Sequence, residues 1–470
     1  FKDSFIQASW IESKYEAIGS IVGVPADQAK LLTCFLMSVL LGIIQHKYVH
    51  GARKRHIYSI TFGLLFGVFQ FGLEGLVNFA FSSSVVYLML MLIPREKVAL
   101  PVFVFSLGFL SYVHIYRMVT DWMGWKMDAS GLQMMLTCKL SSLAFCYQDG
   151  LTMKKKPEKV PPEQKTLIVD VLPSLLEYYS YLCFYAGFII GPPFEFMEYL
   201  RYVREVGEYE KSPSTVKPAL MVLGKSLIFM VLLLLGDHYF PYQLCGSPEF
   251  YEYSFLYRVF YFNMAMVVCK IRYTTGWKFT EAGMTASGLG YAGKDKAGND
   301  SWSRGVSIVY EKAEFAWTAK EMIDNWNVPV SIWIRRYIYS RIIFESPNPS
   351  AKRRSFAQHS SFVISGFWHG FYPSYYIMFF WFSIHSEISK MVYSSNWSFL
   401  PFKDALKWVA WSVQWQIGNC LGIIFVLLDF WLVYSFLQAI YFWPLLTLSV
   451  GWLFFKVTGL HRKARKTKIQ

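Results

Sequence analysis

Apolar residues recur in long runs along almost the whole chain, separated by shorter polar and charged connections. A helix that crosses a bilayer needs about 20 mainly apolar residues, and most of the runs approach that length. The pattern predicts roughly ten to twelve spanning helices, about eleven in all. They are expected at residues 31–46, 57–73, 77–93, 98–116, 132–147, 175–190, 219–236, 254–269, 362–384, 405–425, 426–442 and 443–457.

Two of these runs, 132–147 and 175–190, are short for a straight crossing. Such segments can be tilted, partly embedded or re-entrant. Non-helical backbone at membrane depth persists only where protein or a water-filled cavity covers it. We therefore expect an all-α polytopic membrane protein whose helices surround an internal reaction chamber. The long stretch 272–326 is interpreted as a polar connection between spans.

Composition supports one continuous membrane domain. Hydrophobic residues make up 54% of the 470 residues, whereas a soluble chain of this length normally divides into domains with polar surfaces. We predict a single membrane-embedded domain over residues 1–470, with an N-terminal segment at 1–28 and a basic tail at 459–470. The net charge of +14 indicates basic loops that face an anionic leaflet. Contact with a polyanionic soluble substrate is the alternative, and nucleic-acid binding is not expected.

The basic tail also bears on localisation. Lys466 and Lys468 occupy the fifth and third positions from the end, which resembles the dilysine retrieval signal of endoplasmic reticulum membrane proteins. An ordinary juxtamembrane basic tail explains the same residues equally well. We predict a multi-pass protein of the endoplasmic reticulum membrane.

The sequence does not favour a bound metal or cofactor. Gly288-Leu-Gly290-Tyr-Ala-Gly293 matches a dinucleotide-binding pattern, but that motif requires a preceding strand. His46 and His50 have helical i, i+4 spacing and are better interpreted as an interfacial helix end than as a metal site. The seven cysteines contain no C-x-x-C pair and are expected to be packing residues. A soluble-type H-x4-D acyltransferase signature and a G-x-S-x-G elbow are both absent.

His369 is the main candidate for chemistry. It lies inside the predicted span 362–384, in Trp368-His369-Gly370, and an ionisable residue in a spanning segment usually faces a cavity or a polar partner. An imidazole is the commonest general base near neutral pH. From position alone, a histidine satisfied by a hydrogen bond between helices is an equally good interpretation.

Asn327 is the second candidate. It precedes Pro329, which suits the first turn of a helix, so a capping role alone is the favoured interpretation of its position. The segment that follows carries Arg335, Arg336 and Arg341 among apolar residues. It is typical of an amphipathic helix at an interface or a chamber wall.

Taken together, these motifs resemble a known family. Trp326-Asn327, followed 42 residues later by His369, is similar to the paired signature of membrane-bound O-acyltransferases. Further stretches resemble the lysophospholipid acyltransferase branch of that family. They are Lys139–Gly150, Pro173–Tyr179, Gly191-Pro192-Pro193-Phe194, Gly288-Leu-Gly290 and Arg336–Arg341, in the expected order, and the resemblance runs from about Leu31 to the C-terminus.

The resemblance implies transfer of a fatty acyl group from acyl-CoA, as co-substrate, to the free hydroxyl of a lysophospholipid at sn-2. It implies that His369 is the general base and that Asn327 either stabilises the oxyanion or orients a reactant. Trp326, Trp368 and Tyr372 are candidates for the pocket lining, with packing an equal explanation. Arg335 and Arg336 are candidates for CoA phosphates, with ordinary loop charge as the alternative.

Two other functions stay open at this point. The first is acylation of a different acceptor by the same family, such as diacylglycerol, a sterol or a secreted protein. The second is a membrane transporter, which would place charges within several spans, whereas charges here crowd into the connections. Oligomeric state and acyl-chain preference have no signal in the sequence.

Overall fold

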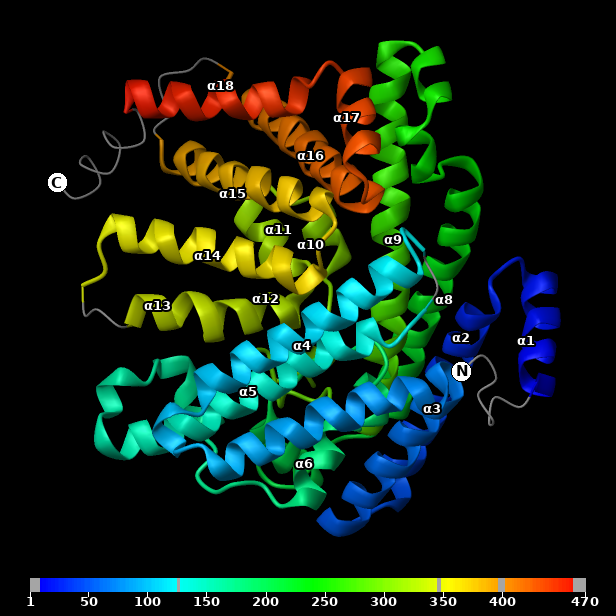
Figure 1. Ribbon diagram of the computed structural model, residues 1–470, viewed down its shortest axis with the longest axis vertical. Helices are drawn as coiled ribbons and strands as arrows, with labels where there is room; N and C mark the ends of the chain where they lie inside the picture. Colours follow the sequence, from blue (N-terminus) through cyan, green and yellow to red (C-terminus); the bar gives the residue numbers. More distant parts are fainter. Residues whose placement is uncertain (1–8, 125–126, 345–347, 396–401, 460–470) are drawn as a thin grey trace. The chain divides into compact units, whose positions relative to one another are not determined.

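The protein is described here by a computed structural model that covers residues 9–124, 127–344, 348–395 and 402–459 (Figure 1). Every regular element in these residues is a helix or a helical turn. The described residues contain no strand, apart from one isolated bridge between Lys294 and Asp300. The all-α class expected from the apolar runs is therefore confirmed.

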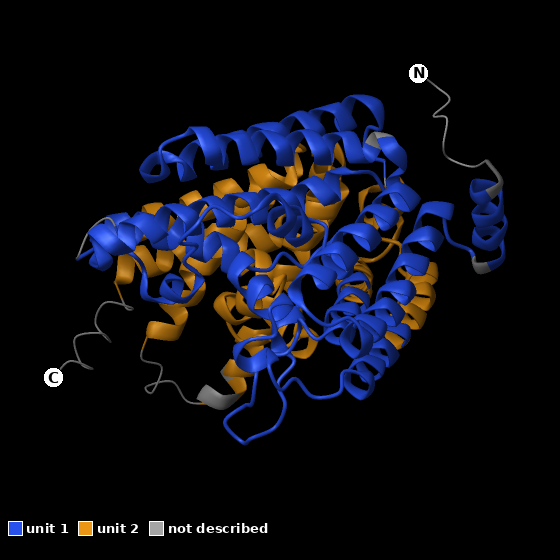
Figure 2. Cartoon of the chain, turned by 90° about the horizontal axis from the view of Figure 1, so that it is seen from below, with its two compact units in different colours: residues 1–227, 276–307, 332–353 blue, residues 228–275, 308–331, 354–470 orange. Residues whose placement is uncertain are grey.

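The chain divides into two compact units, and each is interleaved with the other along the sequence (Figure 2). Unit 1 comprises the described residues of Phe1–Leu227, Gly276–Ser307 and Ile332–Arg353. Unit 2 comprises those of Ile228–Thr275, Ile308–Ser331 and Arg354–Gln470. The prediction of one membrane-embedded domain over 1–470 stays a prediction.

Unit 1 contains most of the N-terminal helices. They are α1 (Ser9–Val22), α2 (Ala26–Tyr48), α3 (Ala52–Leu92), α4 (Ala99–Thr120), α5 (Ser130–Lys155), α6 (Leu175–Leu182), α7 (Phe196–Val203) and α13 (Ser340–Phe344). The long helix α3 is broken at Gly72, whose φ of 69° is accessible to glycine at little cost. The break lies close to the point where the two predicted runs, 57–73 and 77–93, meet.

Unit 2 contains the C-terminal helices. They are α10 (Tyr310–Glu314), α11 (Ala319–Asn325), α14 (Ala351–His369), α15 (Pro373–Ser394), α16 (Lys403–Leu427), α17 (Phe430–Ala439) and α18 (Trp443–Thr458). Helix α14 has its first three residues in unit 1, and three more helices also cross between the units along the sequence: α8 (Val216–Tyr239), α9 (Phe255–Ser287) and α12 (Val328–Ile334). The fully buried side chains of Phe262, Leu421 and Phe436 lie at the centre of the unit 2 core.

Six helical segments of the described residues are long and apolar enough to cross a membrane. They are Ala26–Tyr48, Ala52–Leu73, Gly75–Leu92, Ala99–Thr120, Val216–Gly246 and Lys407–Leu427. Helices α17 and α18 together make a seventh candidate, bent by 82° at their junction. A polytopic membrane protein is thus confirmed, but the predicted count of about eleven spans is not.

The prediction of one span over 362–384 is wrong. Helix α14 ends at His369, and α15 begins at Pro373. Gly370, at φ 120°, turns the chain between them, and Pro373 suits the first turn of the next helix. Likewise, the runs 426–442 and 443–457 form the bent pair α17 and α18, not two spans.

Two further segments differ in length from the predicted elements. The run 175–190 is helical only over α6, which begins with a Ser174–Glu177 capping box and ends at Leu182. The rest is a buried turn, with Tyr185–Gly187 as a short 3-10 helix. The stretch 272–326 is not a simple connection, because α9 continues to Ser287 and α10 and α11 follow.

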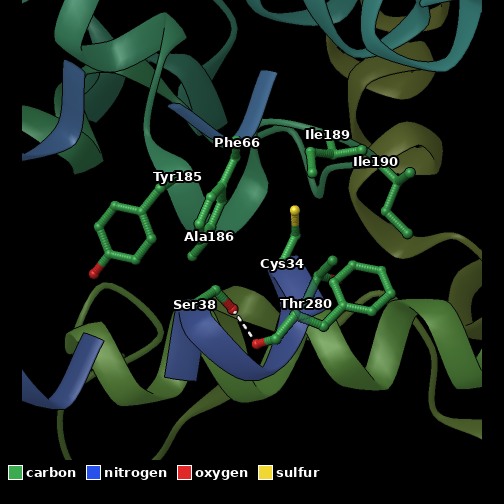
Figure 3. Close-up of a pocket in the computed structure, with 9 residues that line it drawn as sticks. Cys34, Ser38, Phe66, Tyr185, Ala186, Ile189, Ile190 and Thr280 are labelled. Carbon is green, nitrogen blue, oxygen red and sulfur yellow. Dashed lines mark hydrogen bonds between the residues drawn. The ribbon is translucent and has the colours of Figure 1, made fainter. Parts of the chain in front are cut away.

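Small residues allow close packing inside unit 1. A Cβ atom on Gly63 of α3 would lie 1.7 Å from the carbonyl oxygen of Cys183. A Cβ on Gly42 of α2 would lie 2.7 Å from the backbone nitrogen of Ser287. Unit 1 also contains a small pocket, with Cys34, Ser38 and Phe66 among its walls (Figure 3). Its lining in the described residues includes none of the predicted site residues.

Candidate active site

His369 lies at the point where a helix ends. It is the last residue of α14, and the next amide, that of Gly370, donates to the carbonyl oxygens of Gly366 and Phe367. The sequence prediction of a histidine inside a continuous span is thus corrected to a histidine at a helix C-terminus. The imidazole is partly buried.

Aromatic rings surround the imidazole on several sides. Phe425 of α16 meets it edge-on, with ring centroids 4.9 Å apart. Phe379 of α15 stacks at 5.6 Å, and Tyr375 lies at 5.7 Å. The rings come from α15 and α16, so two helices besides α14 fix the position of His369.

Asn327 occupies the junction between α11 and α12. Its φ of 43° is left-handed, a region in which asparagine is enriched among residues other than glycine. Its carbonyl oxygen accepts a hydrogen bond from the Ser331 amide at 3.0 Å and so begins α12. Within the described chain no hydrogen bond to the Asn327 side-chain amide is found, so the backbone, and not the side chain, caps this helix.

The neighbouring residue Trp326 is held from two directions. Its backbone amide donates to the Met322 carbonyl oxygen, which ends α11. Its ring packs edge-on against Tyr273 of α9, with centroids 6.1 Å apart. Trp326 therefore ties the backbone turn at Asn327 to α9.

The two other predicted lining residues are more deeply buried. Trp368 is 1% exposed and contacts the His369 ring at 4.7 Å between centroids. Tyr372 is 7% exposed, precedes α15, and packs on Tyr375 at 6.0 Å. Trp368 thus contacts the candidate base directly, whereas Tyr372 packs on Tyr375, which in turn contacts it. The structure thus brings Trp326, Asn327, Trp368, His369 and Tyr372 into unit 2.

The predicted phosphate contacts lie in unit 1 instead. Arg335 and Arg336 belong to one π-helical turn, Arg335–Tyr339. Arg336 donates to Glu195 at 2.8 Å, whereas the side chain of Arg335 is 52% exposed and lies 3.8 Å from Glu163. Arg336 thus has a carboxylate partner within its own unit, and Arg335 is the more accessible of the two.

Several motif stretches that carried the resemblance meet in unit 1 around a second ion pair. Arg341 forms a two-pronged contact with Asp149 of α5, one prong at 2.7 Å, and also reaches Gln164. Beside it, the Tyr337 hydroxyl donates to Glu195 at 2.8 Å. The Asp149 side chain is only 3% exposed. Sequence reasoning quoted these stretches but did not predict that they touch, because the two partners are 192 residues apart.

Comparison of the sequence with known protein families identifies one family that matches it. The model of the membrane-bound O-acyltransferase family matches residues 115–427, which include both Asn327 and His369.

The chain is also similar to curated members of that family over most of its length. It is 30% identical to membrane-bound glycerophospholipid O-acyltransferase 2 of Gallus gallus, over 77% of this chain and 72% of the relative. Lysophospholipid acyltransferase 2 of Arabidopsis thaliana is 28% identical, over 80% and 81%. The lysophospholipid acyltransferase of Schizosaccharomyces pombe is 26% identical, over 78% and 72%.

These matches cover the helices that position the candidate base and the candidate amide. They confirm the resemblance found in the paired Trp-Asn and Trp-His motifs. The chain belongs to the membrane-bound O-acyltransferase family and is a multi-pass membrane acyltransferase.

Proposed function

We propose that this enzyme transfers a fatty acyl group from acyl-CoA to the free sn-2 hydroxyl of a lysophospholipid, giving a diacyl phospholipid and CoA. The observation that carries the proposal is the agreement among relatives. Those from chicken, fission yeast and Arabidopsis are all named for acylation of glycerophospholipids or lysophospholipids, and each matches at least 77% of this chain. The acceptor is thus the best-supported part of the proposal.

His369 is proposed as the general base. A lipid hydroxyl is a weak nucleophile, so a positioned base must accept its proton as the oxygen attacks the thioester carbonyl carbon. The imidazolium that forms would sit at the C-terminus of α14. A helix C-terminus carries partial negative charge and stabilises a nearby cation. The end of α14 therefore supports the charge that His369 acquires.

Asn327 is proposed to act on the intermediate or on a reactant. Attack gives a tetrahedral intermediate whose oxyanion a preorganised amide N–H can stabilise. The strained backbone at Asn327 supports this role, since left-handed residues cluster at functional sites. The intermediate then collapses: the C–S bond breaks, and the leaving CoA sulfur takes the proton from His369. Both substrates are thereby converted without a covalent acyl-enzyme.

The surroundings suit an apolar acyl chain and a polyanionic donor. Trp368, against His369, and Tyr372, against Tyr375, are buried and are proposed to line the pocket together with Trp326. Arg335 and Arg336 are proposed contacts for CoA phosphates, and the exposed Arg335 is the stronger candidate. We also propose the endoplasmic reticulum membrane as the location. Lys466 and Lys468, which suggested it, lie outside the described residues.

An acceptor panel tests the proposal. Purified enzyme is given one acyl-CoA and, in separate reactions, 1-acyl lysophospholipids with different headgroups, 2-acyl lysophospholipid, diacylglycerol, cholesterol and a peptide. We expect release of CoA thiol that depends on 1-acyl lysophospholipid, together with diacyl product detected by lipid mass spectrometry. Acylation of the other acceptors alone would overturn the lysophospholipid assignment. Lysophospholipid uptake into vesicles without CoA release would indicate transport instead.

A further inference from the structure

A chain of buried polar groups crosses the unit that contains His369 and Asn327. Lys270 of α9 forms an ion pair with Glu314 of α10, and the two side chains are 14% and 6% exposed. The Lys270 ammonium also donates to the Asn419 side-chain oxygen at 2.9 Å. Asn419 in turn donates to the Asn263 side-chain oxygen at 2.8 Å. These four side chains are called the Lys270 network below.

The network joins three elements that are far apart in sequence. Lys270 and Asn263 lie on α9, Asn419 lies on α16, and Glu314 ends α10. A second contact strengthens the connection to α16, because the Trp415 indole donates to Glu314 at 2.8 Å. The network therefore fixes α9, α10 and α16 to one another.

Stability alone is a poor explanation for these charges. Cys420 and Leu421, which follow Asn419 on α16, are both fully buried. An ion pair in such surroundings pays a desolvation cost that its attraction often fails to exceed, and apolar replacements of similar volume are often no less stable. Directional hydrogen bonds between polar groups, unlike apolar contacts, fix one relative position of the helices that carry them.

One end of the network leads to Asn327. The hairpin of α10 and α11 is closed by the Val309 amide, which donates to the Asn325 carbonyl oxygen at 3.1 Å. Asn325 is two residues before Asn327, so Glu314 lies in the hairpin that presents this asparagine. On the α9 side, Tyr273 packs against Trp326 and is three residues, or one helical turn, from Lys270.

The other end of the network leads to His369. Helix α16, which carries Trp415 and Asn419, also carries Phe425. Phe425 contacts both the His369 ring, at 4.9 Å, and the Tyr375 ring, at 4.6 Å. The elements joined by the network are therefore also those that hold the two candidate catalytic side chains.

We propose that the Lys270 network is a positioning device for the acyl-transfer reaction. It holds the α10–α11 hairpin and α16 in register, so that Asn327 and His369 keep their reactive geometry. Lys270, Glu314, Asn263 and Asn419 are positioning residues and do not touch the substrate. The inference rests on the proposed function of Asn327 and His369. A displacement of about 1 Å at a reacting group can cost on the order of 100-fold in rate, so modest loosening is measurable.

The test replaces the ion pair by neutral groups of similar size. We expect Lys270→Met with Glu314→Gln to lower kcat by about 10-fold or more, because the reacting groups lose alignment. The KM values for acyl-CoA and lysophospholipid should stay within about twofold, because no group that binds substrate is removed. Thermal unfolding of the detergent-solubilised double variant should resemble wild type. Wild-type kcat in this folded variant overturns the inference.

A matched control uses another buried ion pair on the same helix. Lys278 and Glu281 are 12% and 8% exposed and lie within one turn of α9. The double variant Lys278→Met with Glu281→Gln should keep wild-type kcat. An equal loss of kcat in this control would show that any buried charge on α9 has the same effect, and would overturn the specific role of the Lys270 network.

A second variant keeps the test decisive if the neutral pair does not fold. Asn419→Leu removes the hydrogen bonds to Lys270 and Asn263 but leaves the ion pair intact. We expect kcat to fall several-fold with KM values unchanged. Unchanged kcat in Asn419→Leu contradicts the inference.

The last comparison separates this inference from the proposed function. If the network acts through Asn327, the Lys270→Met, Glu314→Gln change should lower kcat by a smaller factor in an Asn327→Ala enzyme than in wild type. Changes at coupled sites do not add. An equal factor in both enzymes would overturn the inference. An active His369→Ala enzyme would instead overturn the proposed base. An inactive His369→Ala enzyme beside a fully active network variant would overturn the inference alone.

Discussion

The imidazole of His369 and the ring of Phe425 meet edge-on, at an interplanar angle of 86° and a centroid distance of 4.9 Å. Edge-to-face pairs of this kind contribute about 0.5–1.5 kcal/mol beyond simple burial. The contact joins the end of α14 to α16. A side chain at a helix end is free to move unless its neighbours hold it, and here an aromatic ring from another helix does so.

His369→Ala should abolish acyl transfer while the protein still extracts as a folded species. Removing a general base costs about 10²–10⁴-fold in rate, and kcat measured by CoA release gives the loss. His359 lies on the same helix and is hydrogen-bonded to the Ser383 hydroxyl at 2.7 Å. It provides the matched control, and His359→Ala should keep most of the wild-type turnover. Near-normal turnover by His369→Ala would show that another group is the base.

Asn327 permits a test that separates the backbone from the side chain. Because its φ is 43°, glycine fits the turn without strain, whereas alanine does not. Both Asn327→Gly and Asn327→Ala should lower kcat by about 10²–10³-fold if the amide stabilises the oxyanion. Only the alanine variant should also unfold at a lower temperature. A change limited to KM for the acceptor would indicate an orienting role instead.

Asp149→Asn should destabilise unit 1 strongly. The change leaves the Arg341 guanidinium without its charged partner in a buried setting, and breaking a buried pair costs about 3–5 kcal/mol. Thermal unfolding in detergent measures the loss. Asp170→Asn is the control, because the pair between Lys154 and Asp170 is 64% and 61% exposed. An exposed pair is worth only about 0–1 kcal/mol, so equal shifts in the two variants would contradict a structural role for Asp149.

Gly63→Ala should be poorly tolerated. The added methyl would lie 1.7 Å from the Cys183 carbonyl oxygen, so α3 and the turn after α6 would have to separate. Gly108 of α4 is the matched control, since a Cβ there meets nothing within 4 Å. Gly108→Ala should be neutral or gain up to about 1 kcal/mol from helix propensity. The folded yield after solubilisation distinguishes the two, and similar yields would show that the packing at Gly63 can relax.

Some of the fold was predictable because it follows from length and composition alone. Helices α2, α4 and α8 each coincide with an uninterrupted apolar run. The run 362–384 is equally apolar but forms two helices, since Gly370 and Pro373 interrupt it. The mean hydropathy of the run does not reveal such a break. The Gly-Phe-Tyr-Pro sequence was the available signal, because glycine and proline interrupt local structure.

For the candidate site, the sequence indicated residues but not their contacts. His369 and Asn327 were singled out because each belongs to a short local motif; the structure places both in unit 2, and their catalytic roles stay predictions. The contacts that hold them were not found. Lys270 and Asn419 are 149 residues apart, and Phe425 is an ordinary member of an apolar helix. Spacing along the chain carries no information about such pairs, because only the tertiary fold brings them together.

The ion pair between Asp149 and Arg341 has a consequence for biosynthesis. The two residues are 192 positions apart in the sequence. At a synthesis rate of roughly 5–20 residues per second, Asp149 is added to the chain about 10–40 s before Arg341. Unit 1 can therefore mature only after translation has passed the segment that contains Asn327.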